Sequence, residues 1–450
     1  MRVLRKPFIS VTIECSMEAP LLVVSDDQGN MFEIPHLHMA GMALGEMRVP
    51  AQEELIPLPH GSNLFMLPGR AAVGFNTSLG RFTIIEQYRG VKVTAAAAFM
   101  APAYLQFLRP AYCARPGAAR LPLYAYTAVG WYKGEFYAAG TRIDHDSRQD
   151  LRNFRQDRIN KAAERMLRRY PGNRLAAHLV ENCVHCYDCP AARNFVLERW
   201  ECPVPTSPAC NAGCAGCISL QPETTGVVSS QERISFTPTV REIVEFTVPH
   251  LEKAARPVIS FGQGCEGEPL LQSDLIAESI REIRRHTDRG IINLNTNGSR
   301  PRALESLFKA GLDSIRVSLN SAQEKYYTAY YRPRGYAFAD AVESLAVARE
   351  YRRWSSVNYL AFPGFTDHKQ EITALDTLIR SVKPNMLQTR NLNMDPDWYM
   401  QELKLDALEP SFIGMREWIS HIQTSFPWVK LGYFNPPREE MKEAHFAFEA

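Results

Sequence analysis

Seven cysteines lie between Cys183 and Cys217, and they fall into two groups. The downstream group is Cys210, Cys214 and Cys217, separated by three and then two residues. A structural zinc site takes four protein ligands, so this group is one ligand short. A [4Fe–4S] cluster has four irons, and three thiolates leave one iron for a ligand that is not cysteine. An open position of this kind is typical of a catalytic metal centre.

The upstream group is Cys183, Cys186, Cys189 and Cys202, with spacings of two, two and twelve residues. The short spacings suit a second iron–sulfur cluster, and four thiolates also suit tetrahedral zinc. A third interpretation is that only some of the four bind metal, and His185 adds a further candidate ligand. All three interpretations stay open, with a slight preference for iron–sulfur because of the neighbouring group.

The composition of the chain limits the classes of protein to which it can belong. The chain has 450 residues, 51 Lys plus Arg and 49 Asp plus Glu, which gives a net charge of +2. A near-neutral chain argues against nucleic acid as the partner. We see no signal peptide and no apolar run long enough to span a membrane, so we expect a cytoplasmic protein. Thiols stay reduced there, which favours metal binding over disulfides.

The elements that must position these cysteines fall into four segments. Residues 1–142 contain β-branched and aromatic runs such as "FISVTIEC" and "LYAYTAVGWYKGEFYAAGTRI", which predict a β-rich N-terminal domain. Residues 143–204 predict a helical connector that carries the upstream cysteines. An arginine-rich helix face there could dock an acidic electron donor or a polyanion, but interspersed acidic residues favour an ordinary solvated face.

Residues 205–437 alternate strand-like and helix-like stretches, and residues 438–450 form a tail. Five buried strands are predicted, in "RPVISFGQG", "GIINLNTNG", "SIRVSLNSA", "WSSVNYLAFPG" and "NMLQTRNLN". Helical patterns separate them near residues 239–254, 273–286, 302–310, 338–353 and 369–382. This alternation predicts an α/β fold with parallel βα units, in an open sheet or a full or partial barrel.

Four motifs in this order resemble those of the radical SAM superfamily. "CNAGCAGC" has the superfamily's cysteine spacing, "GQGCEGEPLL" is similar to its glycine–glutamate–proline motif, and "LNTNG" and "RVSLNSA" resemble the ends of its third and fourth strands. The resemblance covers about Pro203 to Pro437. It implies a partial (β/α)6 TIM-like barrel, with the chemistry at the C-terminal ends of the strands.

The resemblance also implies an activity. Cys210, Cys214 and Cys217 would hold a [4Fe–4S] cluster whose fourth iron is chelated by S-adenosyl-L-methionine. One-electron reduction, by a donor such as flavodoxin or ferredoxin, would then yield methionine and a 5′-deoxyadenosyl radical that abstracts hydrogen from a small-molecule or peptide substrate. Nothing in the sequence selects methylation, epimerisation, bond formation or rearrangement.

By the same resemblance, five residues would contact the cofactor. Gly267 would let the backbone approach it, and Glu268 would accept from the methionine ammonium. Ser318 and Arg316 would contact the methionine carboxylate, and Asn297 would reach the ribose or the carboxylate.

This chain departs from the superfamily pattern at two positions. Gly216 stands where many members have an aromatic residue near the adenine, and Glu266 replaces the first glycine of the glycine–glutamate motif. Cys265, beside Glu266, is interpreted as a small buried packing residue or as a substrate or cluster ligand.

Substrate contacts are predicted where the sixth barrel strand ends, at Arg390, Asn391, Asn393 and Asp395. The tyrosine-rich stretch "EKYYTAYYRPRGY" could line a substrate mouth, but core-edge packing is the preferred interpretation. Two other functions remain open: an iron–sulfur or zinc protein that serves electron transfer or assembly without radical chemistry, and a radical enzyme acting on RNA or protein.

Overall fold

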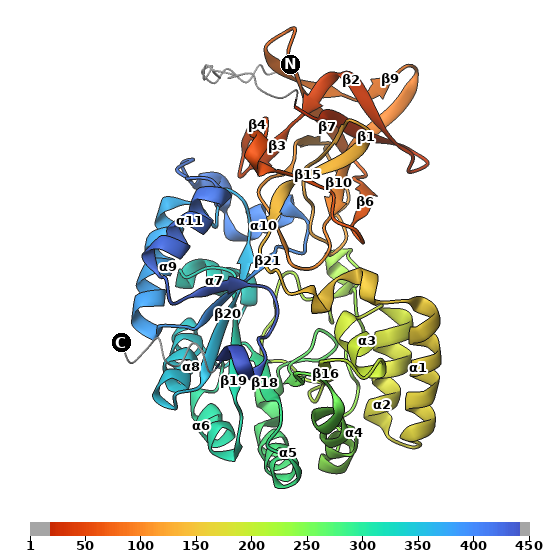
Figure 1. The fold of residues 1–450 in the computed structure, drawn as a ribbon. Coiled ribbons are helices and arrows are strands. Elements are labelled where there is room, and N and C mark those ends of the chain that lie inside the picture. The colour runs from red at the N-terminus through yellow and green to blue at the C-terminus, as the bar shows by residue number, and fades with distance from the viewer. Residues whose placement is uncertain (1–18, 442–450) are drawn as a thin grey trace.

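The computed structural model describes residues 19–441 (Figure 1). Its N-terminal part is a twelve-stranded antiparallel sheet and a three-stranded sheet of order β12-β3-β4. The strands are β1 (Leu21–Asp26), β2 (Met31–Met39), β3 (Gly41–Ala43), β4 (Glu46–Arg48), β5 (Leu55–Pro57), β6 (Asn63–Met66), β7 (Arg70–Asn76), β8 (Arg81–Ile85), β9 (Gln87–Tyr88), β10 (Val91–Phe99), β11 (Tyr104–Gln106), β12 (Arg109–Pro110), β13 (Tyr112–Ala114), β14 (Val129–Tyr132) and β15 (Glu135–Arg142).

Local turn chemistry explains how this sheet starts. The Asp26 carboxylate accepts from the backbone N–H groups of Gln28 and Asn30, and Gly29 has a positive φ of 87°. This turn pairs β1 with β2 and brings Val24 and Ile34 into one core. The predicted strand "FISVTIEC" lies outside the described residues.

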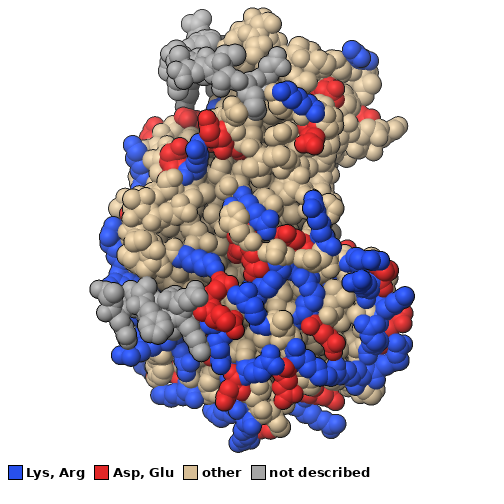
Figure 2. Space-filling view, viewed as in Figure 1, with Lys and Arg blue, Asp and Glu red and all other residues tan. Residues whose placement is uncertain are grey.

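The connector is helical, as predicted. It contains η2 (Ser147–Gln149), η3 (Leu151–Asn153), α1 (Gln156–Arg169), α2 (Arg174–His178), the π-helix η4 (Leu179–Cys186) and α3 (Pro190–Val196). Helix α1 buries Ile159, Ala162, Ala163 and Met166, and its arginines point to solvent. Figure 2 shows basic and acidic side chains interspersed over this side of the molecule, which is typical of a solvated face.

The remaining chain forms a seven-stranded parallel sheet with helices between consecutive strands. In spatial order its strands are β16 (Glu201–Val204), β17 (Val258–Phe261), β18 (Ile291–Thr296), β19 (Ser314–Leu319), β20 (Trp354–Ala361), β21 (Met386–Asn391) and β22 (Lys430–Gly432). The helices are η5 (Glu223–Thr225), α4 (Val240–Lys253), η6 (Pro269–Gln272), α5 (Ser273–His286), α6 (Pro301–Ala310), α7 (Glu324–Tyr331), α8 (Phe338–Glu350), α9 (Lys369–Val382), α10 (Pro396–Leu403), η7 (Leu405–Ala407) and α11 (Met415–Ser425).

The five strands predicted from residues 256–393 are all present. The short strands β16 and β22 at the two edges were not among them. Both have three or four residues, too few to show a period in the sequence.

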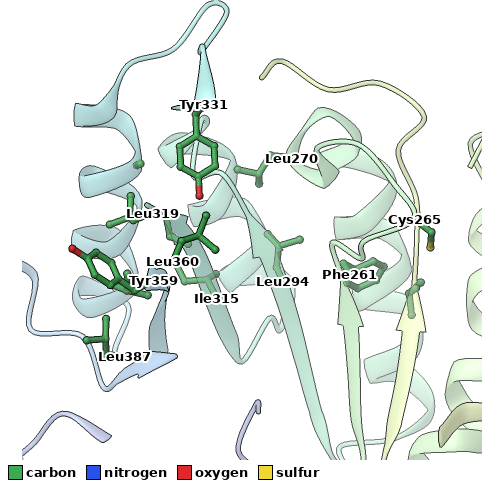
Figure 3. Close-up of a cluster of buried hydrophobic side chains, with 14 of the residues drawn as sticks. Phe261, Cys265, Leu270, Leu294, Ile315, Leu319, Tyr331, Tyr359, Leu360 and Leu387 are labelled. Atoms are coloured by element: carbon green, nitrogen blue, oxygen red, sulfur yellow. The ribbon is translucent and has the colours of Figure 1, made fainter. Parts of the chain in front are cut away.

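Residues alternate between the two faces of this sheet. One face is apolar and packs under the helices: Phe261, Leu294 and Ile315 lie on successive strands of a single buried cluster (Figure 3). The other face carries polar residues that bond across strands. Ser314 on β19 donates to Asn293 on β18 at 2.8 Å, and Asn293 in turn donates to Asn295 along its own strand at 2.9 Å.

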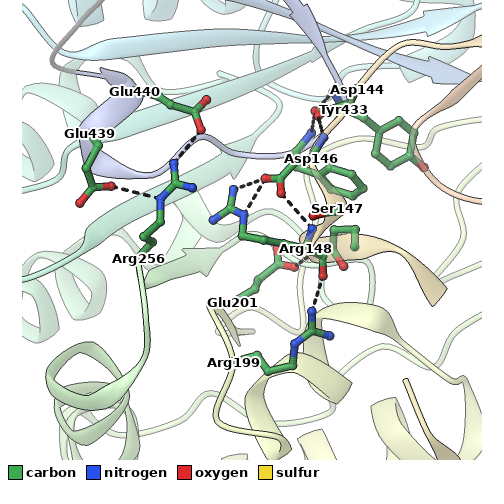
Figure 4. Close-up of polar contacts among 12 residues, drawn as sticks. Asp144, Asp146, Ser147, Arg148, Arg199, Glu201, Arg256, Tyr433, Glu439 and Glu440 are labelled. Carbon is green, nitrogen blue, oxygen red and sulfur yellow. Dashed lines mark hydrogen bonds and ion pairs between the residues drawn. The ribbon is translucent and has the colours of Figure 1, made fainter. Parts of the chain in front are cut away.

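Polar contacts connect the connector with both edges of the sheet (Figure 4). Asp144 accepts from the backbone N–H of Tyr433 at 2.8 Å, just after β22. Gln149 donates to the Glu201 carboxylate on β16 at 3.0 Å. The connector therefore fixes β16 and β22 relative to each other.

Among the described residues, no helix combines the length and the apolar character needed to cross a membrane.

Candidate active site

The cysteines at positions 210, 214 and 217 lie on an irregular loop that follows β16, which we call the cluster loop (residues 205–222). It starts at the C-terminal end of a parallel strand, where α/β folds place their ligands. The carbonyl oxygens of Tyr330 and Tyr331, in the last turn of α7, accept from the N–H groups of Ala215 and Gly213, both at 2.9 Å. The tyrosine-rich stretch is thus a buried helix that fixes this loop.

Three arginines surround the cluster loop. Arg334 donates to the carbonyl oxygen of Ala212 at 2.9 Å, and Arg233 lies 3.6 Å from the Cys217 sulfur. Together with Arg332 they line a cavity of about 480 Å³ that reaches Cys214 and Cys217. Cationic groups here offset the negative charge that several thiolates bring together.

Burial raises the pKa values of the Cys210 and Cys214 thiols, and the neighbouring thiols act in the same direction. Neutral thiols are thus favoured until a cation occupies the loop. The three sulfurs are not packed as closely as ligands of one ion: among residues 19–441, only a different group brings three His, Cys, Asp or Glu ligand atoms within 4.8 Å of one another. A [4Fe–4S] cubane needs sulfurs that are spaced more widely than the ligands of one ion, because each thiolate binds a different iron.

A second loop, residues 262–268 after β17, braces the cluster loop from the other side. The N–H groups of Gly267 and Glu268 donate to the carbonyl oxygens of Ser207 and Ala209 at 2.7 and 2.8 Å. A Cβ atom on Gly267 would lie 1.9 Å from the Ala209 oxygen. The close approach that requires glycine here is thus to the cluster loop itself.

The contacts of Glu266 explain why a glutamate stands at the position of the superfamily's first glycine. One oxygen of its buried carboxylate accepts from the N–H groups of Thr206 and Ser207 and from the Thr206 hydroxyl, and the other accepts from Gly262 and Gln263. Burial raises the pKa of Glu266 to about 7, against the effect of these hydrogen bonds. The carboxylate joins the end of β16 to the end of β17.

Glu268 and Asn297 form a second brace. Glu268 accepts from the Thr296 hydroxyl at 2.5 Å and from the Asn297 N–H at 2.8 Å, and burial raises its pKa to about 7. The Asn297 side chain donates to Asn211, between the first two cluster cysteines, at 2.8 Å. Both predicted cofactor residues thus lie beside the cluster loop and bond to it, Glu268 through its N–H to the Ala209 carbonyl oxygen and Asn297 through its amide to the Asn211 side chain.

Arg316 and Ser318 lie on the polar face of β19. Arg316 donates to Gln388 at 2.9 Å, and burial beside Arg390 lowers its pKa to about 9. Ser318 accepts from Asn358 at 3.4 Å. The Arg316 Nε and Asn358 Oδ1 atoms are buried and have no hydrogen-bond partner within residues 19–441, so this face can still bond to a ligand.

An aromatic ring lies against Gly216 after all, but it comes from another element. A Cβ on Gly216 would lie 2.8 Å from the Tyr330 hydroxyl and 3.2 Å from the Met394 sulfur. No local pattern indicates this contact, because Tyr330 is more than a hundred residues downstream of Gly216.

The four upstream cysteines do not lie together closely enough to bind one single ion. Cys183, on the π-helix, lies with His178 and Cys265 so that the three ligand atoms are all within 4.8 Å of one another. Hydrogen bonding to Cys265 lowers the pKa of Cys183 to about 6 and raises that of Cys265. Cys186 is exposed and Cys189 is half-buried.

The position of Cys202 corrects the prediction that this residue belongs to the upstream group of metal ligands. It is fully buried on β16 within the main hydrophobic cluster, and its sulfur lies 4.0 Å from the Pro203 carbonyl oxygen. Its sulfur is not among the three ligand atoms that lie within 4.8 Å of one another, so Cys202 packs in the core outside that group. The cysteine spacing did not indicate this, because β16 was not predicted. Cys202 lies on that strand, whereas Cys183 and Cys186 lie on the helix η4.

Two predicted substrate residues instead hold the N-terminal part. The Asp395 oxygens accept from Arg70 and Leu121 and from two N–H groups at the start of α10. Asn391 accepts from the Gln106 N–H and donates to the Tyr104 carbonyl oxygen. These contacts correct the substrate assignment of both residues, since no free acceptor remains on Asp395 and both ends of Asn391 are bonded.

Arg390 and Asn393, the other two residues predicted to contact substrate, remain candidates for that role. Arg390 donates to the Tyr433 carbonyl oxygen at 2.7 Å and stacks 3.4 Å from the centre of the Tyr433 ring. Asn393 is half-buried, and no polar contact occupies its side chain among those the described residues make.

Comparison with known proteins agrees with the motifs. Residues 204–375 match the model of the radical SAM superfamily. No curated protein matches the sequence significantly.

Several solved structures are similar to this one. Methylornithine synthase is 12% identical, with 63% of this chain and 74% of that chain covered and a TM-score of 0.35. HydG, a maturase of the [FeFe]-hydrogenase, is 12% identical, with 65% and 70% covered and a TM-score of 0.36. A radical SAM methyltransferase from Sphaerobacter thermophilus is 16% identical, with 46% and 63% covered and a TM-score of 0.33. This chain is therefore an enzyme that carries a radical SAM domain at residues 204–375.

Proposed function

We propose that this enzyme cleaves S-adenosyl-L-methionine reductively at a [4Fe–4S] cluster held by Cys210, Cys214 and Cys217. When bound, the cluster and S-adenosyl-L-methionine supply a 5′-deoxyadenosyl radical for hydrogen abstraction. The observation that carries the proposal is the cluster loop, where three half-buried cysteines are fixed by α7 on one side and by residues 262–268 on the other.

The residues present fit these groups. Three thiols share a loop with Arg233 beside one sulfur, and the neighbouring polar face of the sheet has buried atoms without partners. Arg316 and Ser318 offer donors for a carboxylate from this face. We further infer that the seven-stranded sheet is a partial barrel and that this polar face is its interior.

The chain's own residues determine the geometry of the site. Glu266 and Gly267 set the distance between the cluster loop and β17, and Asn297 fixes Asn211 between two of the cysteines. The Tyr330 ring fills the space beside Gly216, and we infer that it also excludes water from this side of the cluster.

The site indicates only the chemical classes of the substrate and of the electron donor. Arg390 and Asn393 remain candidates for contacts to a small-molecule or peptide substrate. An electron donor of the flavodoxin or ferredoxin kind would approach the exposed side of the cluster loop, where Arg233, Arg332 and Arg334 offer positive charge to an acidic protein.

Anaerobic reconstitution with iron and sulfide, followed by reductant and S-adenosyl-L-methionine, tests the proposal. Wild type should form 5′-deoxyadenosine, and a C210A/C214A/C217A variant should form none. Metal bound without any cleavage would instead identify a protein of electron transfer or assembly.

A further inference from the structure

We propose that His178, Cys183 and Cys265 form a mononuclear zinc site, with Cys189 as the fourth ligand, that clamps the connector to the loop bracing the cluster. The site is separate from the three cluster cysteines, and it does not depend on the proposed radical chemistry.

The spacing of the three ligand atoms favours a single ion. They all lie within 4.8 Å of one another. Around tetrahedral zinc, bond lengths of about 2.0–2.3 Å place neighbouring ligand atoms about 3.5–3.8 Å apart, so small side-chain movements close the site. A cubane needs thiolates on different irons and therefore further apart.

The chemistry of the donors is that of zinc. Two thiols and an imidazole are the ligand types of structural zinc sites. Cys183 and Cys265 are each 3% exposed, which suits a closed structural site. The His178 Nε2 atom is buried and has no hydrogen-bond partner among the described residues, although buried polar atoms are normally paired.

The backbone is shaped to bring these groups together. Residues 179–186 form a π-helix, in which each turn joins residue i to residue i+5, so His178 and Cys183 lie one turn apart. An α-helix of the same sequence would turn the two side chains to different faces. Single π-turns occur frequently at functional sites.

Cys189 is the candidate for the fourth position. Its backbone N–H donates to the Cys183 carbonyl oxygen at 2.8 Å, which folds the chain back beside Cys183. Cys186 lies on the same π-helix but is exposed, and Cys202 is held in the hydrophobic core on β16.

The position of Cys265 connects the proposed zinc site to the residues that hold the cluster loop. Cys265 directly precedes Glu266 and Gly267, which hold the cluster loop, and its carbonyl oxygen accepts from the Ile234 N–H at 2.8 Å. A metal bond to Cys265 would therefore fix the loop that braces the [4Fe–4S] cysteines, with no role in electron transfer.

The test uses the full chain in the C210A/C214A/C217A background, expressed with zinc and iron in the medium and purified without oxygen. Elemental analysis should find about one zinc ion per chain and no iron. X-ray absorption at the zinc edge should show sulfur at about 2.3 Å and nitrogen at about 2.0–2.1 Å.

Matched variants in the same background assign the ligands. C183A, C265A and C189A should each lose at least about tenfold in zinc affinity, because the loss of even a residue that only supports a ligand costs about 10–100-fold. C186A and C202A should keep wild-type affinity. H178C should keep zinc while the absorption spectrum shows one more sulfur and one nitrogen fewer, which a merely structural role of His178 would not produce.

The proposal is overturned if this protein contains iron in place of zinc, contains no metal, or shows a Cys183–Cys265 disulfide by mass spectrometry. If variants misfold, the absorption spectrum of the parent protein still decides the ligand set. Formation of 5′-deoxyadenosine by wild type is measured separately, so failure of the zinc site and failure of the radical chemistry are distinguishable.

Discussion

At the scale of single residues, two glycines near the cluster cysteines are constrained by close packing and a third is not. Gly267 faces the Ala209 carbonyl oxygen and Gly216 faces the Tyr330 hydroxyl, whereas a Cβ on Gly213 would meet nothing nearer than 3.7 Å. None of the three has a positive φ, so packing alone distinguishes them.

The first prediction concerns Gly267. G267A should displace the cluster loop, because a Cβ would lie 1.9 Å from the Ala209 oxygen, and overpacking of this kind costs about 1–3 kcal/mol or more. Iron bound per chain after anaerobic reconstitution should fall well below the wild-type value. G213A is the matched control in the same loop and should retain wild-type iron; equal losses in both variants would contradict the packing argument.

The second prediction concerns Gly216 and Tyr330. G216A should lower the free energy of unfolding by about 1–3 kcal/mol, because its Cβ would meet the Tyr330 hydroxyl at 2.8 Å. Y330F removes that oxygen, so the double variant should recover part of the loss. A double-mutant cycle by denaturant unfolding measures the coupling, and purely additive effects would show that the two residues do not interact.

The third prediction concerns the pH dependence of stability. Burial lowers the pKa of His250 to about 4, and the ring lies 3.2 Å from the Trp200 carbonyl oxygen. The unfolded chain therefore binds a proton that the folded chain does not between about pH 6.5 and pH 4. Stability should fall by about 3 kcal/mol as the pH drops through this range, and it should be fully present above pH 6.5.

Denaturant unfolding of wild type and H250Q across this range checks the effect. The amide of H250Q does not titrate, so the variant should show a flatter dependence.

At the scale of elements, the cluster loop has no regular structure and depends on three neighbours. Helix α7 binds its middle, the end of β18 binds it through Asn297, and the loop after β17 binds its start. Each contact comes from a different βα unit, so the site forms only when the sheet is assembled.

The fourth prediction tests the brace between β16 and β17. In E266Q an amide nitrogen replaces one carboxylate oxygen and faces N–H donors, which leaves buried donors without an acceptor. Each unpaired group costs about 1–3 kcal/mol, so E266Q should be destabilised and should bind less iron. E232Q, on the exposed segment after η5, is the control and should match wild type in thermal unfolding and iron content.

At the scale of the whole molecule, the N-terminal sheet is attached to the radical SAM domain by buried polar contacts. Arg70 on β7 donates to Asp395 at 2.7 Å, and their side chains are 4% and 1% exposed. Asn391 bonds to the backbone of β11. The end of β21, where the sequence predicted substrate contacts, is thus partly covered by the N-terminal part.

The fifth prediction concerns this attachment. R70A leaves the Asp395 carboxylate buried without its cation and should lower the free energy of unfolding by about 3–5 kcal/mol. R115A breaks the exposed ion pair with Glu86, where the effect should stay below about 1 kcal/mol. Equal effects of the two variants in denaturant unfolding would contradict a buried attachment.

The family and most of the sheet could be predicted from local patterns along the chain. The cysteine spacing and the motifs after three strands are local patterns, and the family match covers them. The five central strands and the helices α5, α6, α8 and α9 between them were predicted because each carries a clear apolar run or period, whereas the short helix α7 was not predicted.

Contacts between residues that are distant in the chain could not be predicted and became visible in the folded protein. His178 and Cys265 are far apart in the chain, and only the packing of the π-helix against the loop after β17 brings them to Cys183. Packing likewise placed Tyr330 beside Gly216 and turned Asp395 toward Arg70. Spacing reports neighbours along one element, whereas contacts between elements depend on the register and direction of strands and helices, which no local pattern encodes.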